Sequence, residues 1–180
     1  MSTLQTLPIN KSFLSNNKFE FVLRRIPNFT FLVQNISLPS VGLQSSSVNT
    51  PYATISIPGN QLSYSPLSVT FIVDEDMKSW IEIFWWMYQL GNPISFNKRG
   101  NLKDNAIGID AVVADATLQI KTNSNNPNMK INFYGLYPTD LGEIQFTSTE
   151  GQEFQTCAVT FNYTYYELEG IETLGETATR

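Results

Sequence analysis

Apolar residues recur at every second position over much of this chain, and this period is the signature of β-strands with one buried face. In residues 18–25, for example, Phe19, Phe21 and Leu23 alternate with Glu20, Val22 and Arg24. We therefore expect a mainly β protein in which 154–168 is the longest strand and 18–25 pairs with 29–36 as a hairpin. The other expected strands are 66–73, a strand or bent pair in 107–120, 129–134 and 143–147.

Residues 74–93 break this pattern and predict a helix over 75–90. Three acidic residues, Asp74 to Asp76, stand at the start, where a helix favours side-chain acceptors and negative charge. Gly91 and Pro93 stand at the end, where a left-handed C-cap and a stop are expected. One broad apolar face holds Trp80, Ile83, Phe84, Met87, Tyr88 and Leu90, and the opposite polar stripe holds Lys78, Glu82 and Gln89.

The tryptophans of this helix have different expected roles. Trp80, with Phe84 and Met87, lies on the broad apolar face and is expected in the core. Trp85 and Trp86 flank the polar stripe. Because a helix on a sheet buries only one face, these two indoles predict a second apolar partner, either a long loop or a neighbouring subunit.

Residues 38–65 are rich in Ser, Asn, Pro and Gly, which is typical of a flexible loop or of a projecting hairpin. A short β-like run, 52–57, followed by the turn signal Pro58-Gly59-Asn60, favours a hairpin over 41–65. Long projections usually contact another molecule. The predicted contact residues are Pro51, Tyr52, Ile57 and Pro58, together with Trp85 and Trp86.

The length of 180 residues suits one domain. We expect a single β-rich domain over 18–168, an N-terminal arm over 1–17 that orders against something else, and a flexible tail over 169–180. Neither a signal peptide nor an apolar run long enough to cross a bilayer is apparent. The expectation is a product made in the cytoplasm without a membrane anchor.

Composition argues against catalysis. Histidine is absent and Cys157 is the single cysteine, so imidazole triads, disulfide frameworks and thiolate metal clusters are excluded. The carboxylate pairs Glu143/Glu150 and Asp110/Asp115 have nothing that places them across a cleft. We therefore expect no enzyme, no catalytic or metal site and no cofactor.

Charge argues for assembly and against nucleic-acid binding. Charged residues make up 15% of the chain, against roughly 25% in ordinary soluble domains, which suits a surface covered by partners. The net charge of −5 disfavours tight binding to phosphate. The small basic cluster of Lys98, Arg99 and Lys103 is read as a solvated loop, with a phosphate contact as the alternative.

Two stretches carry a resemblance. Residues 132–167 contain a strand, the turn Gly135-Leu136-Tyr137-Pro138, a Gly142-Glu143 strand start and a closing strand that ends aromatic-aromatic-acidic. A second stretch combines Leu38-Pro39, the Pro58-Gly59 hairpin and the run from Leu67 into the helix. Both resemble the tail tube proteins of contractile-tailed (myovirus) bacteriophages, and together they cover most of residues 30–167.

This resemblance implies a tail-tube type fold of two packed antiparallel sheets, barrel- or sandwich-like, with one flanking helix. Six copies would join sheet edges into a ring, and rings would stack into the inner tube of the virion tail. The segment 41–65 and the N-terminal arm would bridge copies, sheath and baseplate proteins would be further partners, and phage DNA would pass without specific binding.

Two alternatives remain open at this stage. The chain could be a baseplate tube initiator or a tube-terminating protein of the same fold. It could also be a carbohydrate-binding β-sandwich, with Trp85 and Trp86 stacking on sugar rings.

Overall fold

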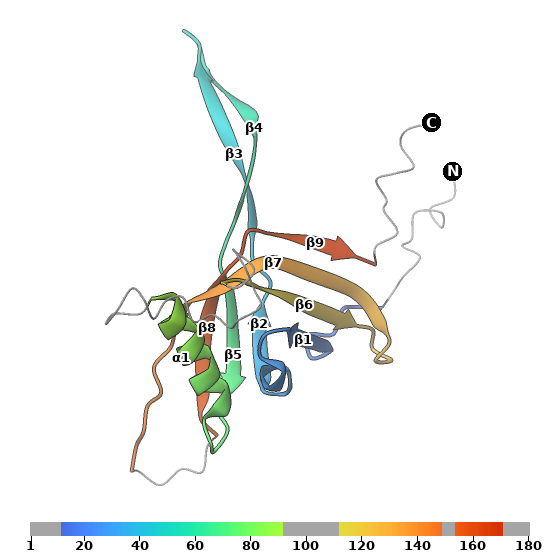
Figure 1. Ribbon diagram of the computed structural model, residues 1–180. Coiled ribbons are helices and arrows are strands. Elements are labelled where there is room, and N and C mark those ends of the chain that lie inside the picture. Colours follow the sequence, from blue (N-terminus) through green and yellow to red (C-terminus); the bar gives the residue numbers. More distant parts are fainter. Residues whose placement is uncertain (1–11, 92–111, 149–153, 171–180) are drawn as a thin grey trace.

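The computed structural model describes residues 12–91, 112–148 and 154–170. They form nine strands, one α-helix and a short 3-10 helix, η2 (Figure 1). In chain order these are β1 Phe19–Leu23, η2 Pro27–Phe31, β2 Val33–Ser37, β3 Val41–Asn49, β4 Thr54–Tyr64, β5 Leu67–Ile72, α1 Lys78–Leu90, β6 Ala114–Lys121, β7 Pro127–Leu141, β8 Thr156–Asn162 and β9 Tyr165–Glu169.

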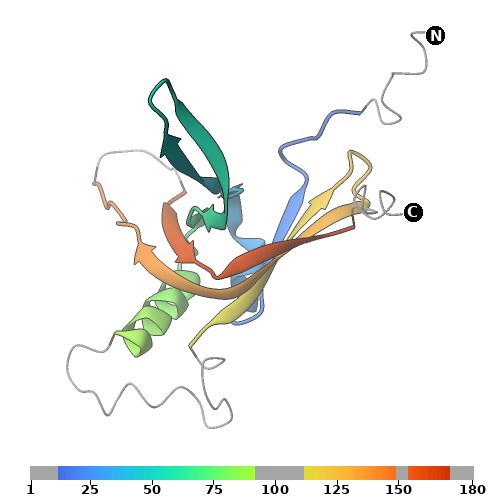
Figure 2. The same cartoon turned by 90° about the horizontal axis from the view of Figure 1, so that it is seen from above.

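Two antiparallel sheets share the long strand β7. The first sheet has the order β1-β6-β7-β9 and uses the first part of β7. The second sheet has the order β2-β5-β8-β7 and uses its last part, from Tyr137 to Leu141. The expected mainly β fold with two antiparallel sheets and one helix is confirmed (Figures 1 and 2).

Gly135 lies where β7 passes from one sheet to the other. Its φ of +68° is a left-handed conformation that glycine adopts without steric cost. A Cβ at this position would lie 2.7 Å from Thr164 Oγ1, and Thr164 N donates to Tyr134 O at 2.9 Å. Thr164 itself lies in the gap between β8 and β9, so the bend in β7 faces the break between its two partner strands.

This crossover corrects three expectations. Residues 135–142 do not form a turn between strands, because β7 continues to Leu141. The expected single strand 154–168 is split into β8 and β9, so β7 is the longest strand. Residues 143–147 form no strand. Glycine and proline signalled a turn here, but they serve a bend and register shifts inside one strand.

The expected hairpin between 18–25 and 29–36 is also wrong. β1 pairs with β6 and β2 pairs with β5, so consecutive strands lie in different sheets. The η2 helix between them places Phe29 fully in the core, with its ring 4.9 Å from that of Phe71. Because Phe29 is buried, the chain crosses the core from the first sheet to the second. A tight turn at Pro27 would instead keep both strands in one sheet.

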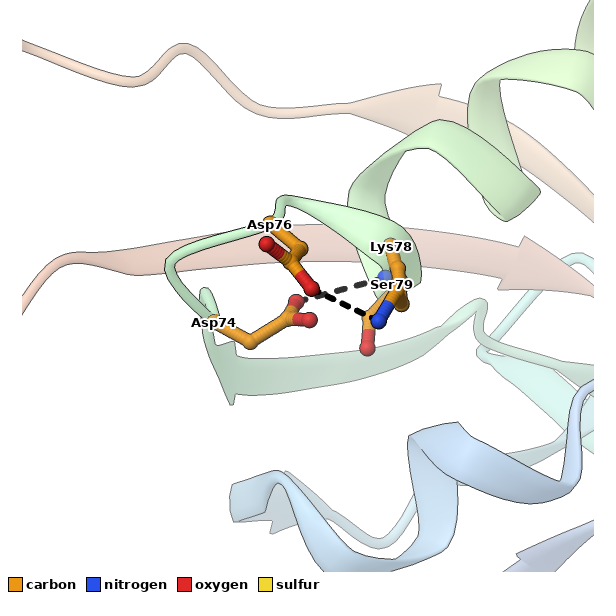
Figure 3. Close-up of polar contacts among 4 residues, drawn as sticks. All are labelled: Asp74, Asp76, Lys78 and Ser79. Carbon is orange, nitrogen blue, oxygen red and sulfur yellow. Dashed lines mark hydrogen bonds and ion pairs between the residues drawn. The ribbon is translucent and has the colours of Figure 1, made fainter.

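The helix α1 begins three residues later than the sequence indicated. Met77, with φ 53°, precedes the helix, and the Asp74 carboxylate accepts a hydrogen bond from the Ser79 backbone amide at 3.4 Å (Figure 3). Lys78 Nζ, on the first residue of α1, pairs with Asp76 before the helix at 2.6 Å, and both side chains are exposed. Gly91 ends the helix with φ −119°, so the expected left-handed cap is wrong, and Pro93 lies outside the described residues.

The buried face of α1 is rotated from the expected one. Ser79, Ile83 and Trp86 are buried, whereas Phe84 is 41% exposed. The Trp86 ring lies 6.3 Å from that of Phe161 in the core. Trp86 is therefore a core residue of the protomer, and the expectation that Phe84 is buried and Trp86 is free for a partner is wrong. The small side chain of Ser79 lies on the side of α1 that faces the core. A search for large apolar residues alone does not find this side of the helix.

Side chains from both sheets, α1 and η2 build the single core. The buried apolar residues are Phe21, Leu23, Ile26, Phe29, Leu67, Val69, Phe71, Ile83, Trp86, Ala116, Leu118, Ile131, Phe133, Leu136, Cys157, Val159 and Phe161. β3 and β4 contribute none of them.

Candidate assembly surfaces

The strands β3 and β4 form a separate two-stranded hairpin that projects from the body (Figures 1 and 2). Its turn lies at Thr50–Ala53, where the Thr50 amide donates to Ala53 O at 2.9 Å. The turn expected at Pro58 and Gly59 is wrong, since both residues lie within β4 beside a register shift. A Cβ on Gly59 would approach Gln44 O to 2.5 Å, so this irregular pairing requires glycine.

The hairpin exposes apolar side chains and carries no charge. Seven of its large apolar side chains are exposed, namely Val41, Leu43, Val48, Tyr52, Ile55, Ile57 and Leu62. No residue between Arg25 and Asp74 is charged. Natural proteins usually protect free strand edges with charges, because bare edges pair with other chains. An uncharged projecting hairpin is therefore a surface suited to burial against another protein.

The predicted contact residues have different positions on this hairpin. Tyr52 and Pro51 lie at its tip, and Tyr52 is 98% exposed. Ile57 and Pro58 lie in β4, where Ile57 is paired in register with Ser46 and Pro58 with Ser45. The structure brings these four residues onto one element.

Trp85 lies elsewhere, on the solvent side of α1. Its ring contacts Tyr88 at 5.4 Å and Phe84 at 6.0 Å, while Phe84 stacks on Trp80 at 5.4 Å. Trp85 is 52% exposed. This aromatic surface of α1 is partly exposed, so Trp85 remains a candidate contact residue, and its partner stays a prediction.

The first sheet exposes a polar face and two edges, β1 and β9. Glu20 on β1 pairs with Lys121 on β6 at 2.7 Å. At the other edge, between β7 and β9, Tyr134 Oη donates to Glu167 at 3.2 Å and Asn132 Nδ2 donates to Glu169 at 3.2 Å. Within the described residues β1 and β9 each have one strand partner, so the outer edge of each is open to another chain.

The residues that carry the family resemblance, Gly135 to Pro138 with Gly142 and Glu143, mostly make contacts within the protomer. Leu136 is buried, Pro138 is buried against β8 and Tyr137 is 37% exposed. Gly142 N donates to Ala158 O at 2.7 Å, and a Cβ on Gly142 would lie 2.9 Å from that oxygen. Glu143 is exposed and accepts a hydrogen bond from Gln145. These residues therefore pack β7 against β8 within one protomer.

Catalytic chemistry finds no support in the described part of the chain. No group of three or more His, Cys, Asp or Glu residues there could hold a metal ion. The Cys157 thiol is buried and its pKa is raised by that burial. No helix among these residues is long and apolar enough to span a membrane. Asp110, Glu150 and the basic cluster Lys98, Arg99 and Lys103 lie outside the described residues.

Sequence reasoning missed a cluster of tyrosines at the base of the hairpin. The Tyr64 ring lies 6.0 Å from Tyr163 and 5.4 Å from Tyr166. Tyr163 Oη donates to Ser65 O at 2.9 Å. The tyrosines near the end of the expected strand 154–168 were a signal of such a cluster. Their partner, Tyr64, could not be identified because it is remote in sequence.

Comparison with known proteins identifies a family and a relative. A family model described as phage tail tube protein matches residues 2–169. The Tail tube terminator protein of Enterobacteria phage T4 is 33% identical over 146 residues, which covers 78% of each chain. In the T4 comparison, identity and coverage are both high enough to indicate common descent.

Chains in two solved contractile systems have a similar fold. A chain in the anti-feeding prophage cap, a tube terminating cap, has a TM-score of 0.65 and 12% identity over 94% of this chain and 99% of that one. A chain in the PVC extracellular contractile injection system sheath-tube complex, in its extended state, has a TM-score of 0.60 and 14% identity over 95% and 99%. At such identities the likeness concerns the fold alone.

Proposed function

The chain belongs to the phage tail tube protein family, and on that premise we propose that it forms a ring that ends the inner tube of a contractile phage tail. The observation that carries this choice is the 33% identity to the T4 tail tube terminator protein. The TM-scores do not separate the roles, since cap and sheath-tube structures match this chain almost equally.

A main tube subunit, which the sequence first suggested, is the second candidate. The family model, described as phage tail tube protein, covers nearly the whole chain and favours it. In either role the protein is a structural component of the virion tail. Its partners would be further copies of itself, the adjoining tube, and sheath or baseplate proteins, and DNA would pass through the ring.

Ring closure in this proposal uses the open edges of the first sheet. Each strand in the order β1-β6-β7-β9 is antiparallel to the next, so β9 runs opposite to β1. A neighbouring copy that places β1 beside β9 therefore continues the antiparallel sheet, and the same joint repeats around a closed ring. Six copies is the number that the family resemblance implies.

Charge at the two edges supports this joint. Glu167 and Glu169 lie on β9, while Lys18 and Arg24 flank β1. Opposite charges across an interface favour association and fix its register. The variant Glu167→Lys with Glu169→Lys should consequently prevent rings without unfolding the protomer.

The matched control is Glu75→Lys with Glu82→Lys, which makes the same charge change at exposed positions near and on α1, away from both edges. Mass photometry would measure ring formation, and circular dichroism would measure protomer folding. Equal ring formation by the two double variants would overturn the β1–β9 joint.

Electron microscopy of the purified protein separates the candidate roles. Discrete rings that do not lengthen as protein concentration rises support the terminator, whereas long tubes support a main tube subunit. Monomers whose melting temperature rises with added sugars would instead support the carbohydrate-binding module. Gold labelling of a tagged copy in virions adds a second readout, because a terminator is labelled at one tube end only.

A further inference from the structure

The projecting hairpin joins the body through one narrow crossing at Ser40 and Ser65. Ser65 N donates to Ser40 O at 3.1 Å, and the two hydroxyl oxygens lie 2.7 Å apart. Beyond this crossing, β3 and β4 pair only with each other among the described residues. The angle at the crossing therefore decides where the distant tip lies.

An aromatic cluster packs against this crossing. Tyr64, the last residue of β4, contacts Tyr163 and Tyr166, whose rings lie 6.1 Å from one another. Both of these tyrosines also pack on Phe133, at 5.2 and 5.5 Å. Phe133 is fully buried in the core. A chain of rings thus connects the hairpin base to the rigid interior of the body.

One directional contact completes the cluster. Tyr163 Oη donates to the carbonyl oxygen of Ser65 at 2.9 Å. Tyr163 itself lies between β8 and β9, where the chain passes from the second sheet to the first. A hydrogen bond requires a narrow range of distance and direction, whereas aromatic pairs are favourable in both offset-stacked and edge-to-face arrangements over centroid separations of roughly 4.5–7 Å. The Tyr163 hydroxyl is therefore the contact that selects one hairpin angle.

We propose that Tyr163 is a positioning residue that holds the β3–β4 hairpin at a fixed angle to the body, so that the tip is aimed before it meets a second copy of the chain. The consequence for assembly rests on the proposed function, but the positioning itself is a property of the single protomer. Loss of one ordinary hydrogen bond lowers the ratio of clamped to unclamped hairpins about fivefold. Pre-ordered contact segments associate more tightly, because less conformational freedom is lost on binding.

Tyr163→Phe tests this directly, because it removes only the hydroxyl. The matched control is Tyr134→Phe, which removes a hydroxyl bonded to Glu167 on the first sheet, away from the hairpin. Spin labels at Ser56 on β4 and Lys130 on β7, in a Cys157→Ala background, would report their distance distribution by pulsed electron paramagnetic resonance in monomers. We expect a clearly broader distribution for Tyr163→Phe and an unchanged one for Tyr134→Phe.

Ring formation is then measured for the same variants without labels. Tyr163→Phe should assemble severalfold less than the parent at equal melting temperature. If Tyr163→Phe leaves the distance distribution as narrow as in the parent, the proposal is overturned. Tyr163→Met, which also removes the hydroxyl and fills the space with a flexible apolar side chain, provides a second variant should Tyr163→Phe fold poorly, and a narrow distribution there likewise overturns the proposal. If even the parent forms no rings, the proposed function fails while the distance measurement still decides the positioning role.

Discussion

At the scale of single residues, Trp86 makes the most varied contacts on α1. It is 2% exposed, its Nε1 donates to Val112 O at 3.1 Å, and the Arg25 guanidinium lies 4.9 Å from its ring. Trp86→Ala should lower the free energy of unfolding by about 3–5 kcal/mol, the usual loss for a buried large aromatic. Denaturant unfolding of the monomer would measure it.

The comparison variants are Phe84→Ala and Trp85→Ala, since these side chains are 41% and 52% exposed and lie outside the core. Each should lower the free energy of unfolding by about 1 kcal/mol or less, as their truncation leaves no core cavity. A loss at Phe84 as large as that at Trp86 would contradict the helix orientation described here.

Gly135 provides a second residue-scale prediction. Gly135→Ala forces a side chain into a left-handed backbone and toward Thr164, which should lower the free energy of unfolding by about 1–3 kcal/mol. Gly91→Ala is the control, because its φ is negative and its added Cβ would meet only Met87 O, at 3.7 Å. Urea titration of both variants would decide, and equal losses would count against strain at the crossover.

The hydroxyl of Tyr163 makes stability depend on pH. Burial, with Tyr166 and Tyr64 nearby, raises the pKa of Tyr163 to about 12, above its ordinary value near 10. The folded state therefore keeps this proton more firmly than the unfolded state, so the stabilisation is complete below about pH 10 and is lost as pH rises towards 12. The parent should lose more stability than Tyr163→Phe between about pH 9 and pH 11.5, measured by urea unfolding. If the parent and Tyr163→Phe lose equal stability over this pH range, the folded state does not raise the pKa of the Tyr163 hydroxyl.

At the scale of elements, alternation predicted β1 and β5 closely because one face of each strand lies in the core. It could not identify pairing, since β1 and β2 have the same period yet lie in different sheets. Gly135 and Pro138 misled for a related reason. Glycine and proline mark both turns and irregular strands, and only the position of β8 and β9 tells the two apart.

The assembly surfaces were partly predictable. The composition of 38–65 indicated a projecting hairpin, which β3 and β4 form, and Trp85 does lie exposed, whereas the contact role of both stays a prediction. Trp86 was missed because apolar residues cover most of the circumference of α1, so that periodicity alone does not define the buried side. The tyrosine cluster was beyond sequence reasoning, because Tyr64 and Tyr163 meet only in the folded chain.

The hairpin as an element yields a further prediction. Replacing residues 45–60 by Asn-Gly, a favoured two-residue turn, would join Gln44 to Gln61 next to the paired Leu43 and Leu62. The protomer should stay folded within about 1 kcal/mol, because β3 and β4 contribute nothing to the core. Assembly into rings or tubes should be lost. Circular dichroism and size-exclusion chromatography would measure both; an unfolded protomer or assemblies of normal size would count against this role.

At the scale of the whole molecule, the prediction concerns DNA. If the polar face of the first sheet lines the inner surface of the ring, its lysines should bind DNA phosphates weakly. Lys121 pairs with Glu20, and Lys130 lies opposite Glu169. Assembled particles should therefore show no salt-sensitive affinity for duplex DNA. Binding titrations at low and at physiological salt would test this. Tight binding that weakens steeply with salt would show that cations, such as Lys98, Arg99 and Lys103, line the path.

The shared strand β7 has a mechanical consequence. Its first part is hydrogen-bonded to β6 and β9, and its last part to β8, along one unbroken backbone. A force that drags one sheet past the other is therefore carried along β7 by covalent bonds, and separation of the sheets at this strand begins where β7 has one partner, at its pairing with β8. A push received at the second sheet is therefore transmitted to the first sheet along the backbone of β7.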